Sequence, residues 1–128
     1  MYSHNVVGSN DLDRSQAFYD AVFGAVGGQP GVRDPNGRII YSYNGGMFMV
    51  TTPINGEPAT VGNGCTVGFG FGSSAEVDAW HDAGVANGGT SIENPPGIRS
   101  MAFGDLYLAY LRDPDGNKLC GMFAVPAQ

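Results

Sequence analysis

The feature that most constrains this chain is an internal repeat. When the sequence is shifted by 62 residues, the segment that starts at His4 lies over the segment that starts at Thr66. The two segments then agree at aromatic, acidic, alanine and glycine positions, namely Phe18 on Trp80, Asp20 on Asp82, Ala21 on Ala83 and Gly27 on Gly89. A repeat of this kind indicates two copies of one supersecondary unit, each burying its apolar face with the help of the other.

Each copy begins with a short β-like stretch followed by a helical pattern. The β-like stretches are residues 5–8 and 67–71. Asp11 is predicted to cap the first helix, and Ser73 followed by Glu76 is typical of a capping box. Paired glycines at residues 27–28 and 88–89 predict the helix ends. The side chains expected to be buried are Leu12, Ser15, Tyr19, Val22 and Phe23, with Phe18 at the edge, in the first helix, and Val77, Trp80 and Val85 in the second.

Three strand candidates follow each helix, so each copy has the order βαβββ. In the first copy they lie around Val32, at residues 39–43 and at residues 47–51, with a tight turn at Asn44-Gly45-Gly46. In the second copy they lie at residues 90–92, 106–112 and 118–124, with a turn at Asp113-Pro114-Asp115-Gly116. The prediction is one α+β domain of two tandem βαβββ modules, at residues 1–53 and 64–128, with a connection at residues 54–63.

Charge and composition restrict the partners. Twelve acidic and six scattered basic residues give a net charge of −6, which repels phosphate backbones and argues against nucleic acid. The same charge would favour a cationic small molecule, although any acidic soluble protein has it. No apolar run is long enough to span a bilayer, and the first residues lack the order of a signal peptide, so we expect no membrane partner and a cytoplasmic location. Cys65 and Cys120 are expected to be free thiols.

Two motifs at opposite ends of the repeat resemble one known family. Asp11-Leu12-x-Arg14-Ser15-x-x-Phe18-Tyr19, preceded by His4, is similar to the opening of glyoxalase, bleomycin-resistance and extradiol-dioxygenase proteins, the vicinal oxygen chelate superfamily. The ending Tyr110-x-x-Asp113-Pro114-Asp115-Gly116-Asn117-Lys118-Leu119 is similar to their last hairpin. The resemblance covers nearly the whole chain. It implies two modules whose curved sheets form an open barrel around a cavity, and a homodimer.

The resemblance also implies where metal ligands would stand. Family members with a metal place His, Gln or Glu on the first and last strands of their modules. The matching positions in this chain are His4, Met49, Thr66 and Cys120, with an uncertainty of one residue at Met49. Divalent ions of the oxygen-preferring kind need imidazole or carboxylate from several sides, and only His4 offers either. We therefore expect no metal and no other cofactor.

Other residues are candidates for a ligand site on the same grounds. Tyr41, Tyr43, Tyr107 and Tyr110 lie on strands and provide aromatic walls if they face the cavity. Arg99, in a loop before a strand, either holds an anionic group of a ligand or is solvated. His81, on the second helix, is expected to be structural or solvated.

The resulting leading hypothesis is a metal-free protein that binds a small organic molecule in the barrel cavity. The site would comprise His4, Tyr41, Tyr43, Met49, Thr66, Arg99, Tyr107, Tyr110 and Cys120, with no catalytic residue assigned. The alternative is a metal-dependent lyase, isomerase or dioxygenase of glyoxalase type, and if the chain is an enzyme, a glyoxalase-type lyase is expected. A scaffold with a closed cavity is the third possibility.

Overall fold

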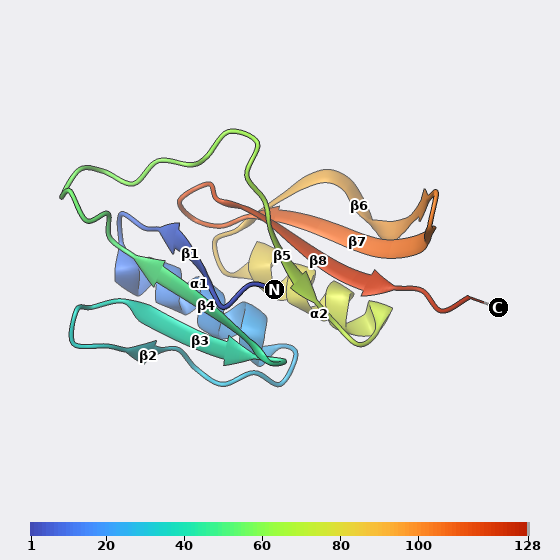
Figure 1. The fold of residues 1–128 in the computed structure, drawn as a ribbon, viewed down its shortest axis with the longest axis horizontal. Coiled ribbons are helices and arrows are strands. Elements are labelled where there is room, and N and C mark those ends of the chain that lie inside the picture. Colours follow the sequence, from blue (N-terminus) through green and yellow to red (C-terminus); the bar gives the residue numbers. More distant parts are fainter. Residues whose placement is uncertain (128) are drawn as a thin grey trace.

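The first half of the chain forms one βαβββ module in the computed structural model, which describes residues 1–127 (Figure 1). Its elements are β1 (Asn5–Gly8), α1 (Leu12–Gly24), β2 (Val32–Arg33), β3 (Ile39–Tyr43) and β4 (Gly46–Thr51). The strands form a sheet of order β1-β4-β3-β2, in which β1 runs parallel to β4 and the other pairs are antiparallel.

The second half repeats this plan. Its elements are β5 (Val67–Gly70), α2 (Ser74–Ala86), β6 (Thr90–Met101), β7 (Gly104–Arg112) and β8 (Lys118–Ala124), and the sheet order is β5-β8-β7-β6. Residues 52–66 cross between the modules as an irregular segment that arches away from both sheets (Figure 1). Gln128, the last residue of the predicted second module, lies outside the described residues.

The backbone keeps the offset of the sequence repeat. Both helices have 13 residues, and Leu12 and Ser74, which begin them, are 62 positions apart. In the parallel pairs Val6 lies beside Met49 and Gly68 beside Cys120, so Met49 and Cys120 are equivalent positions. The predicted α+β fold of two tandem modules is confirmed, and within residues 1–127 the sheets do not close into a barrel.

The helix ends follow from local hydrogen bonding. Asp11 and Ser73 cap the two helices by accepting from the backbone N–H groups of Arg14 and Glu76. Only this half of the predicted capping box forms, because the Glu76 carboxylate accepts a hydrogen bond from Tyr43 instead. At the exits Gly27 and Gly88 have φ of +82° and +97°, a conformation that side chains disfavour.

The segment before β7 differs from the prediction. Residues 95–101 were expected to form a loop, but they belong to β6, which pairs with β7 on both sides of an irregularity between Ile92 and Gly97. A β-bulge absorbs Glu93 to Pro96, so prolines that cannot donate to a sheet are accommodated without ending the strand. Glu93 takes the left-handed conformation there, with φ of 60°.

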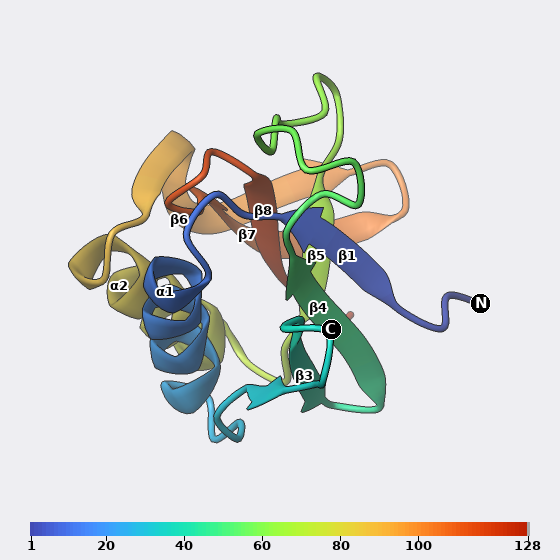
Figure 2. The ribbon, with the colours of Figure 1, turned by 90° about the vertical axis from the view of Figure 1, so that its left-hand side faces the viewer.

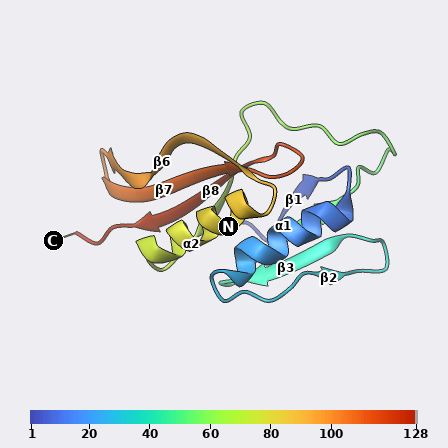
Figure 3. The ribbon, with the colours of Figure 1, turned by 180° about the vertical axis from the view of Figure 1, so that it is seen from behind.

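The core lies between the helices and the sheets. The two helices lie side by side on one side of both sheets (Figures 2 and 3). The largest fully buried side chains are Trp80, Tyr19, Tyr41, Phe18, Phe23, Ile39, Leu111, Leu119, Val22, Val50 and Val77. Phe18, expected at the edge, is fully buried, whereas Val85, expected inside, is half exposed.

One pair of equivalent positions shows how the modules reach similar packing with different side chains. In module two Trp80 replaces the Phe18 of module one, and Gly121 replaces Val50 at the facing position of the last strand. A Cβ on Gly121 would lie 2.8 Å from the Trp80 ring. The larger ring on the helix therefore requires the smaller residue on the strand, because protein cores leave little free volume.

Candidate functional site

A hollow of about 270 Å³ lies at the boundary between the two modules. Module one lines it with the segment at residues 2–5, with Phe23, Tyr41, Tyr43 and Asn44, and with Gly46, Met47 and Phe48 at the start of β4. Module two lines it with Gly68, Phe69 and Gly70 of β5. We call this space the boundary hollow.

Aromatic rings form the inner lining of the boundary hollow. Phe69 of module two meets Phe23 and Phe48 of module one edge to face, with ring centroids 5.3 and 5.2 Å apart. Tyr41 and Tyr43 pack on Phe23 at 4.9 and 5.9 Å. These contacts make the inner part of the hollow apolar and join the two modules through it.

The two tyrosines of this lining have their hydroxyl groups occupied. Tyr41 donates to the Asp20 carboxylate on α1 at 2.8 Å, and Tyr43 donates to Glu76 on α2 at 3.2 Å. Burial and the adjacent carboxylates raise the pKa of both phenols, so both stay protonated at neutral pH. Their rings, not their hydroxyl groups, are the parts available to a ligand.

The entrance of the boundary hollow is polar. The Nδ1 atom of His4 lies 2.7 Å from the Ser3 hydroxyl, and both residues are exposed. Asn44, in the tight turn between β3 and β4, donates from its side chain to the Gly70 carbonyl at 3.4 Å. Asn44 thus links the last hairpin of module one to the first strand of module two.

The repeat counterpart of the boundary hollow, on the other side of the module boundary, is nearly closed. A space of only about 40 Å³ is lined there by Cys65, Thr66, Val67, Lys118, Asn117 and Val7, together with Val61 and Gly62 of the connection. Six of these residues are the repeat equivalents of Ser3, His4, Asn5, Gly46, Met47 and Phe69 in the boundary hollow. The structure therefore contains two related sites, one open and one filled.

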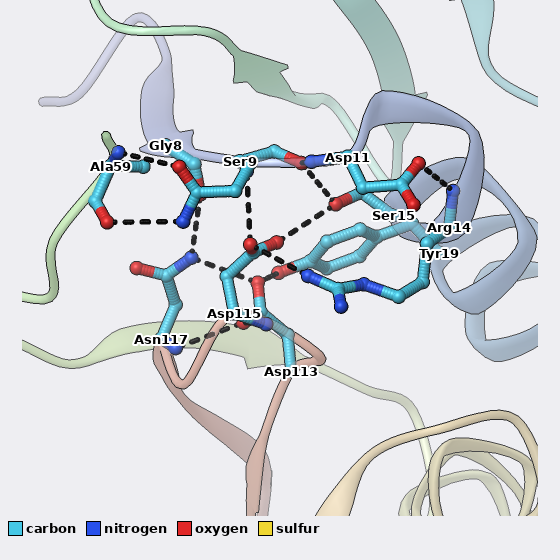
Figure 4. A network of polar contacts seen from close by, with 11 residues as sticks. Gly8, Ser9, Asp11, Arg14, Ser15, Tyr19, Ala59, Asp113, Asp115 and Asn117 are labelled. Atoms are coloured by element: carbon cyan, nitrogen blue, oxygen red, sulfur yellow. Dashed lines mark hydrogen bonds and ion pairs between the residues drawn. The ribbon is translucent and has the colours of Figure 1, made fainter. Parts of the chain in front are cut away.

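The filled site adjoins a network of polar contacts built from the two motifs that carry the family resemblance (Figure 4). Tyr19 on α1 donates to the Asp113 carboxylate at 2.6 Å. Asp115 accepts from Arg14 at 2.9 Å and from Ser15 at 3.1 Å. These contacts fix the β7–β8 turn to the N-terminal half of α1.

The same turn also reaches the first strand. Asn117 donates from its side chain to the Gly8 carbonyl at 3.0 Å, which is the equivalent of the Asn44 contact with Gly70. Asp113 also accepts from the backbone N–H groups of Asp115 and Asn117, which holds the turn in shape. The two motifs that carry the family resemblance thus form a structural joint between the modules.

The predicted site residues are distributed over several places. His4, Tyr41 and Tyr43 line the boundary hollow, and Thr66 lines the counterpart space. Tyr110 and Cys120 lie side by side as cross-strand partners in module two. Met49 is the repeat equivalent of Cys120 in module one.

Two further candidates have structural partners of their own. Tyr107 donates to Asp78 on α2 at 2.7 Å. Arg99 donates to the backbone carbonyls of Asn94, Pro95 and Gly97, and so holds the β-bulge of β6 in place. His81 is buried and lies 2.8 Å from the Ser91 hydroxyl, while burial lowers its pKa, so it serves packing as a neutral side chain.

The side chains at the inherited ligand positions do not fit a divalent metal ion. Burial raises the pKa of the Cys120 thiol, which favours the neutral form that binds metals poorly. Met49 offers a thioether and Thr66 a neutral hydroxyl, neither of which suits ions that prefer carboxylate and imidazole. In the part of the chain that the structure describes, no three His, Cys, Asp or Glu side chains gather as a metal-binding group.

A model of the Glyoxalase/Bleomycin resistance protein/Dioxygenase superfamily matches residues 2–120. The chain belongs to this superfamily. A solved structure of a glyoxalase/bleomycin resistance protein from Albidiferax ferrireducens T118 is 56% identical, with a TM-score of 0.92, and the match covers 96% of this chain and 98% of that one. No curated protein sequence matches the chain.

Two more distant solved structures share the fold. A glyoxalase-related enzyme from Fulvimarina pelagi is 24% identical with a TM-score of 0.69, over 96% of this chain and 87% of that one. A glyoxalase/bleomycin resistance protein/dioxygenase family enzyme from Burkholderia phytofirmans PsJN is 19% identical with a TM-score of 0.71, over 96% and 98%. Within residues 1–127 no helix is long and apolar enough to cross a membrane.

Sequence reasoning missed several residues that line the hollow in this superfamily member. Phe69, Gly68, Gly70 and Asn44 were not candidates, because none of them stands at an inherited ligand position or is a tyrosine of a strand. One signal was available in the repeat. The turn between β3 and β4, at Asn44 and Gly45, is shorter than its counterpart in module two, at residues 113–117.

Proposed function

We propose that this protein binds a small organic molecule in the boundary hollow, without a metal ion. The observation that carries the proposal is a hollow of about 270 Å³ lined by both modules, with aromatic rings inside and polar groups at the entrance. Binding sites for small molecules commonly combine an apolar lining with a few polar groups and lie between structural units.

The proposed site is accordingly narrower than the full set of candidate residues drawn from the sequence. His4, Tyr41 and Tyr43 are retained as ligand-binding residues because they line this hollow. The other candidates stay predictions for the barrel cavity, namely Met49, Thr66, Arg99, Tyr107, Tyr110 and Cys120. The relative from Albidiferax ferrireducens, described as a glyoxalase/bleomycin resistance protein, supports a binding function of the resistance type.

A second candidate is a metal-dependent lyase, isomerase or dioxygenase of glyoxalase type. The observation that favours it is that relatives from Fulvimarina pelagi and Burkholderia phytofirmans are described as enzymes. The donor chemistry at His4, Met49, Thr66 and Cys120 argues against it. A tightly held stoichiometric divalent ion in protein purified without chelator would replace the first proposal by this one.

A homodimer is proposed as well. The edge strands β2 and β6 leave backbone groups unpaired, and Val32 on β2 and Ile98 on β6 are 66% and 57% exposed. Open edges of this kind favour pairing with another chain. Sedimentation at micromolar concentration is expected to show a dimer. The cytoplasmic location stays a prediction of the sequence.

The binding proposal is tested with a library of small organic fragments and thermal unfolding. Binding to the folded state raises the melting temperature. Fragments that raise it for the wild type are expected to lose the effect in Gly68→Trp, which places a ring at the wall of the hollow. Gly24→Trp is the matched control, since Gly24 lies outside the hollow and a Cβ there meets nothing within 4 Å among the described residues.

A further inference from the structure

The two related sites at the module boundary differ in what the last turn of each module brings to them. Five residues, 113–117, separate β7 from β8, and they bring the carboxylates of Asp113 and Asp115 into the joint. Only Asn44 and Gly45 separate β3 from β4. The short turn neither fills the boundary hollow nor brings a charged group to it.

The strand on the other wall also leaves room. Gly68 stands where module one has Val6, and Gly68 and Gly70 both line the hollow. A Cβ built on either glycine meets nothing within 4 Å in the described chain. A flat molecule can therefore lie directly against the backbone of β5, which is a common use of glycine at binding sites.

Charge is excluded from the lining of this hollow. Within residues 1–127, no Asp, Glu, Lys or Arg lines it. The nearby carboxylates of Asp20 and Glu76 are each bonded to a tyrosine hydroxyl behind the aromatic rings. An ionised group placed against these rings would lose water without gaining an opposite charge, which is unfavourable. The net charge of −6 further disfavours an anion.

From these observations we propose that the ligand of the boundary hollow is an uncharged planar aromatic molecule of one or two fused rings. The inference rests on the proposed function and names the chemical class that its site selects. The rings lie against Phe69 and the glycine backbone of β5, and a single polar substituent reaches Asn44 or His4 at the entrance. The volume of about 270 Å³ is slightly below the usual range for drug-sized ligands, which limits the number of rings.

Three naphthalene probes of one shape and different charge test the ligand class. They are 2-naphthol, 2-naphthoate and 2-naphthylmethylammonium, titrated at pH 7 against the full chain with fluorescence detection. Neutral 2-naphthol is expected to bind at least about ten-fold more tightly than either ion, a difference of about 1.4 kcal/mol. Gly68→Trp is expected to weaken 2-naphthol binding at least about ten-fold, and Gly24→Trp to leave it unchanged.

A second variant changes the charge without filling the space. Met47 lines the hollow, is 41% exposed and stands at the equivalent of Lys118, so Met47→Lys copies module two with little risk to folding. It is expected to strengthen 2-naphthoate binding about five-fold or more through a new ion pair. Because Met47 itself lines the hollow, the readout is the ratio of the two affinities, and the preference for 2-naphthol over 2-naphthoate should fall about five-fold or more.

The possible results separate this inference from the proposed function. Tighter binding of either ion, abolished in Gly68→Trp, overturns the ligand class and leaves the site in place. If fragments bind the hollow but none of the three naphthalene probes binds, the ligand class is again overturned and the site stays in place. Probe binding that Gly68→Trp leaves intact overturns both, because the ligand then lies elsewhere. If Gly68→Trp does not fold, the response of the two probes to Met47→Lys decides by itself.

Discussion

The two modules have the same elements at the same spacing, but their contacts across the boundary differ in kind. On one side the β7–β8 turn holds α1 with charged hydrogen bonds through Asp113 and Asp115. On the other side the β3–β4 turn leaves Phe69, Phe48 and Phe23 packed around an open space. The polar side fixes the relation between the modules, so the aromatic side is free to keep a hollow.

The equivalent helix positions follow this division. Arg14 and Ser15 on α1 bind the turn of the other module, and their equivalents on α2 are Glu76 and Val77. Val77 is buried in the core and Glu76 accepts from Tyr43. The joint that Arg14 and Ser15 make with Asp115 therefore has no counterpart on α2, where Val77 packs in the core and Glu76 bonds to Tyr43.

Removing the Asp113 carboxylate, which accepts hydrogen bonds on the polar side of the boundary, is expected to have the largest effect on stability. Asp113→Ala leaves the fully buried Tyr19 hydroxyl and two backbone N–H groups of the turn without their partner. We expect a loss of about 3 kcal/mol in the free energy of unfolding, measured with urea. Glu76→Ala, on the open side, should cost about 1 kcal/mol or less. Equal losses would show that the two sides do not differ in strength.

Module two has a larger helix residue, Trp80, and a smaller strand residue, Gly121, than module one has at the equivalent positions. This exchange predicts that substitutions at Trp80 and Gly121 affect stability in a coupled way. Gly121→Val, which copies Val50, forces a side chain into the Trp80 ring and should cost about 2 kcal/mol or more. In the Trp80→Phe background the same change should cost at least about 1 kcal/mol less, because the smaller ring leaves room for the valine side chain. A double-mutant cycle with urea unfolding measures this coupling. Additive costs would mean that the two positions are not linked by packing.

The polar joint also predicts a dependence of stability on alkaline pH. Burial and the Asp113 carboxylate raise the pKa of Tyr19 well above its ordinary value of about 10. Folding therefore favours the protonated phenol, whose contribution is complete below pH of about 10 and is lost as the pH rises above it. Tyr19→Phe should reduce the decline by about 1 kcal/mol between pH 10 and 11, where a phenol in the unfolded chain becomes mostly ionised. An unchanged slope would remove Tyr19 from this effect.

The smallest expected effect concerns the short turn of the open side. Asn44 has φ of 51°, and its side-chain hydrogen bond to Gly70 is 3.4 Å long. Asn44→Gly should change the free energy of unfolding by less than about 0.5 kcal/mol, because glycine accepts the left-handed conformation. Asn44→Ala should cost about 1 kcal/mol, since alanine disfavours it. If both variants lose the same amount in thermal unfolding, the hydrogen bond and not the conformation matters.

Most of the fold was predictable because the repeat and the local signals agree. The helix starts at Asp11 and Ser73 and the positive-φ glycines at the exits follow from local hydrogen bonding, which sequence patterns report well. The strand from Thr90 to Met101 was only partly predicted, because Pro95 and Pro96 are ordinarily signs of a loop. Pairing with β7 and the carbonyl contacts of Arg99 decide that segment, and both are tertiary contacts.

The candidate site was less predictable for a physical reason. His4, Tyr41 and Tyr43 were named from the sequence and line the hollow. The hollow itself depends on how far a turn of one module extends over a strand of the other. No local pattern contains that distance, so Phe69 and Gly68 could not be recognised as lining residues from their own segment.

Asn44 and Asn117 each contact the first strand of the opposite module. These reciprocal contacts have a consequence for the number of ligands that one chain can bind. A dimer of two identical single modules would carry the same turn at both contacts, and its two boundary sites would be both empty or both full. Fusion of the copies into one chain allows the turns to diverge independently. The covalent link thereby breaks the symmetry of the pair and permits a ratio of one ligand per chain.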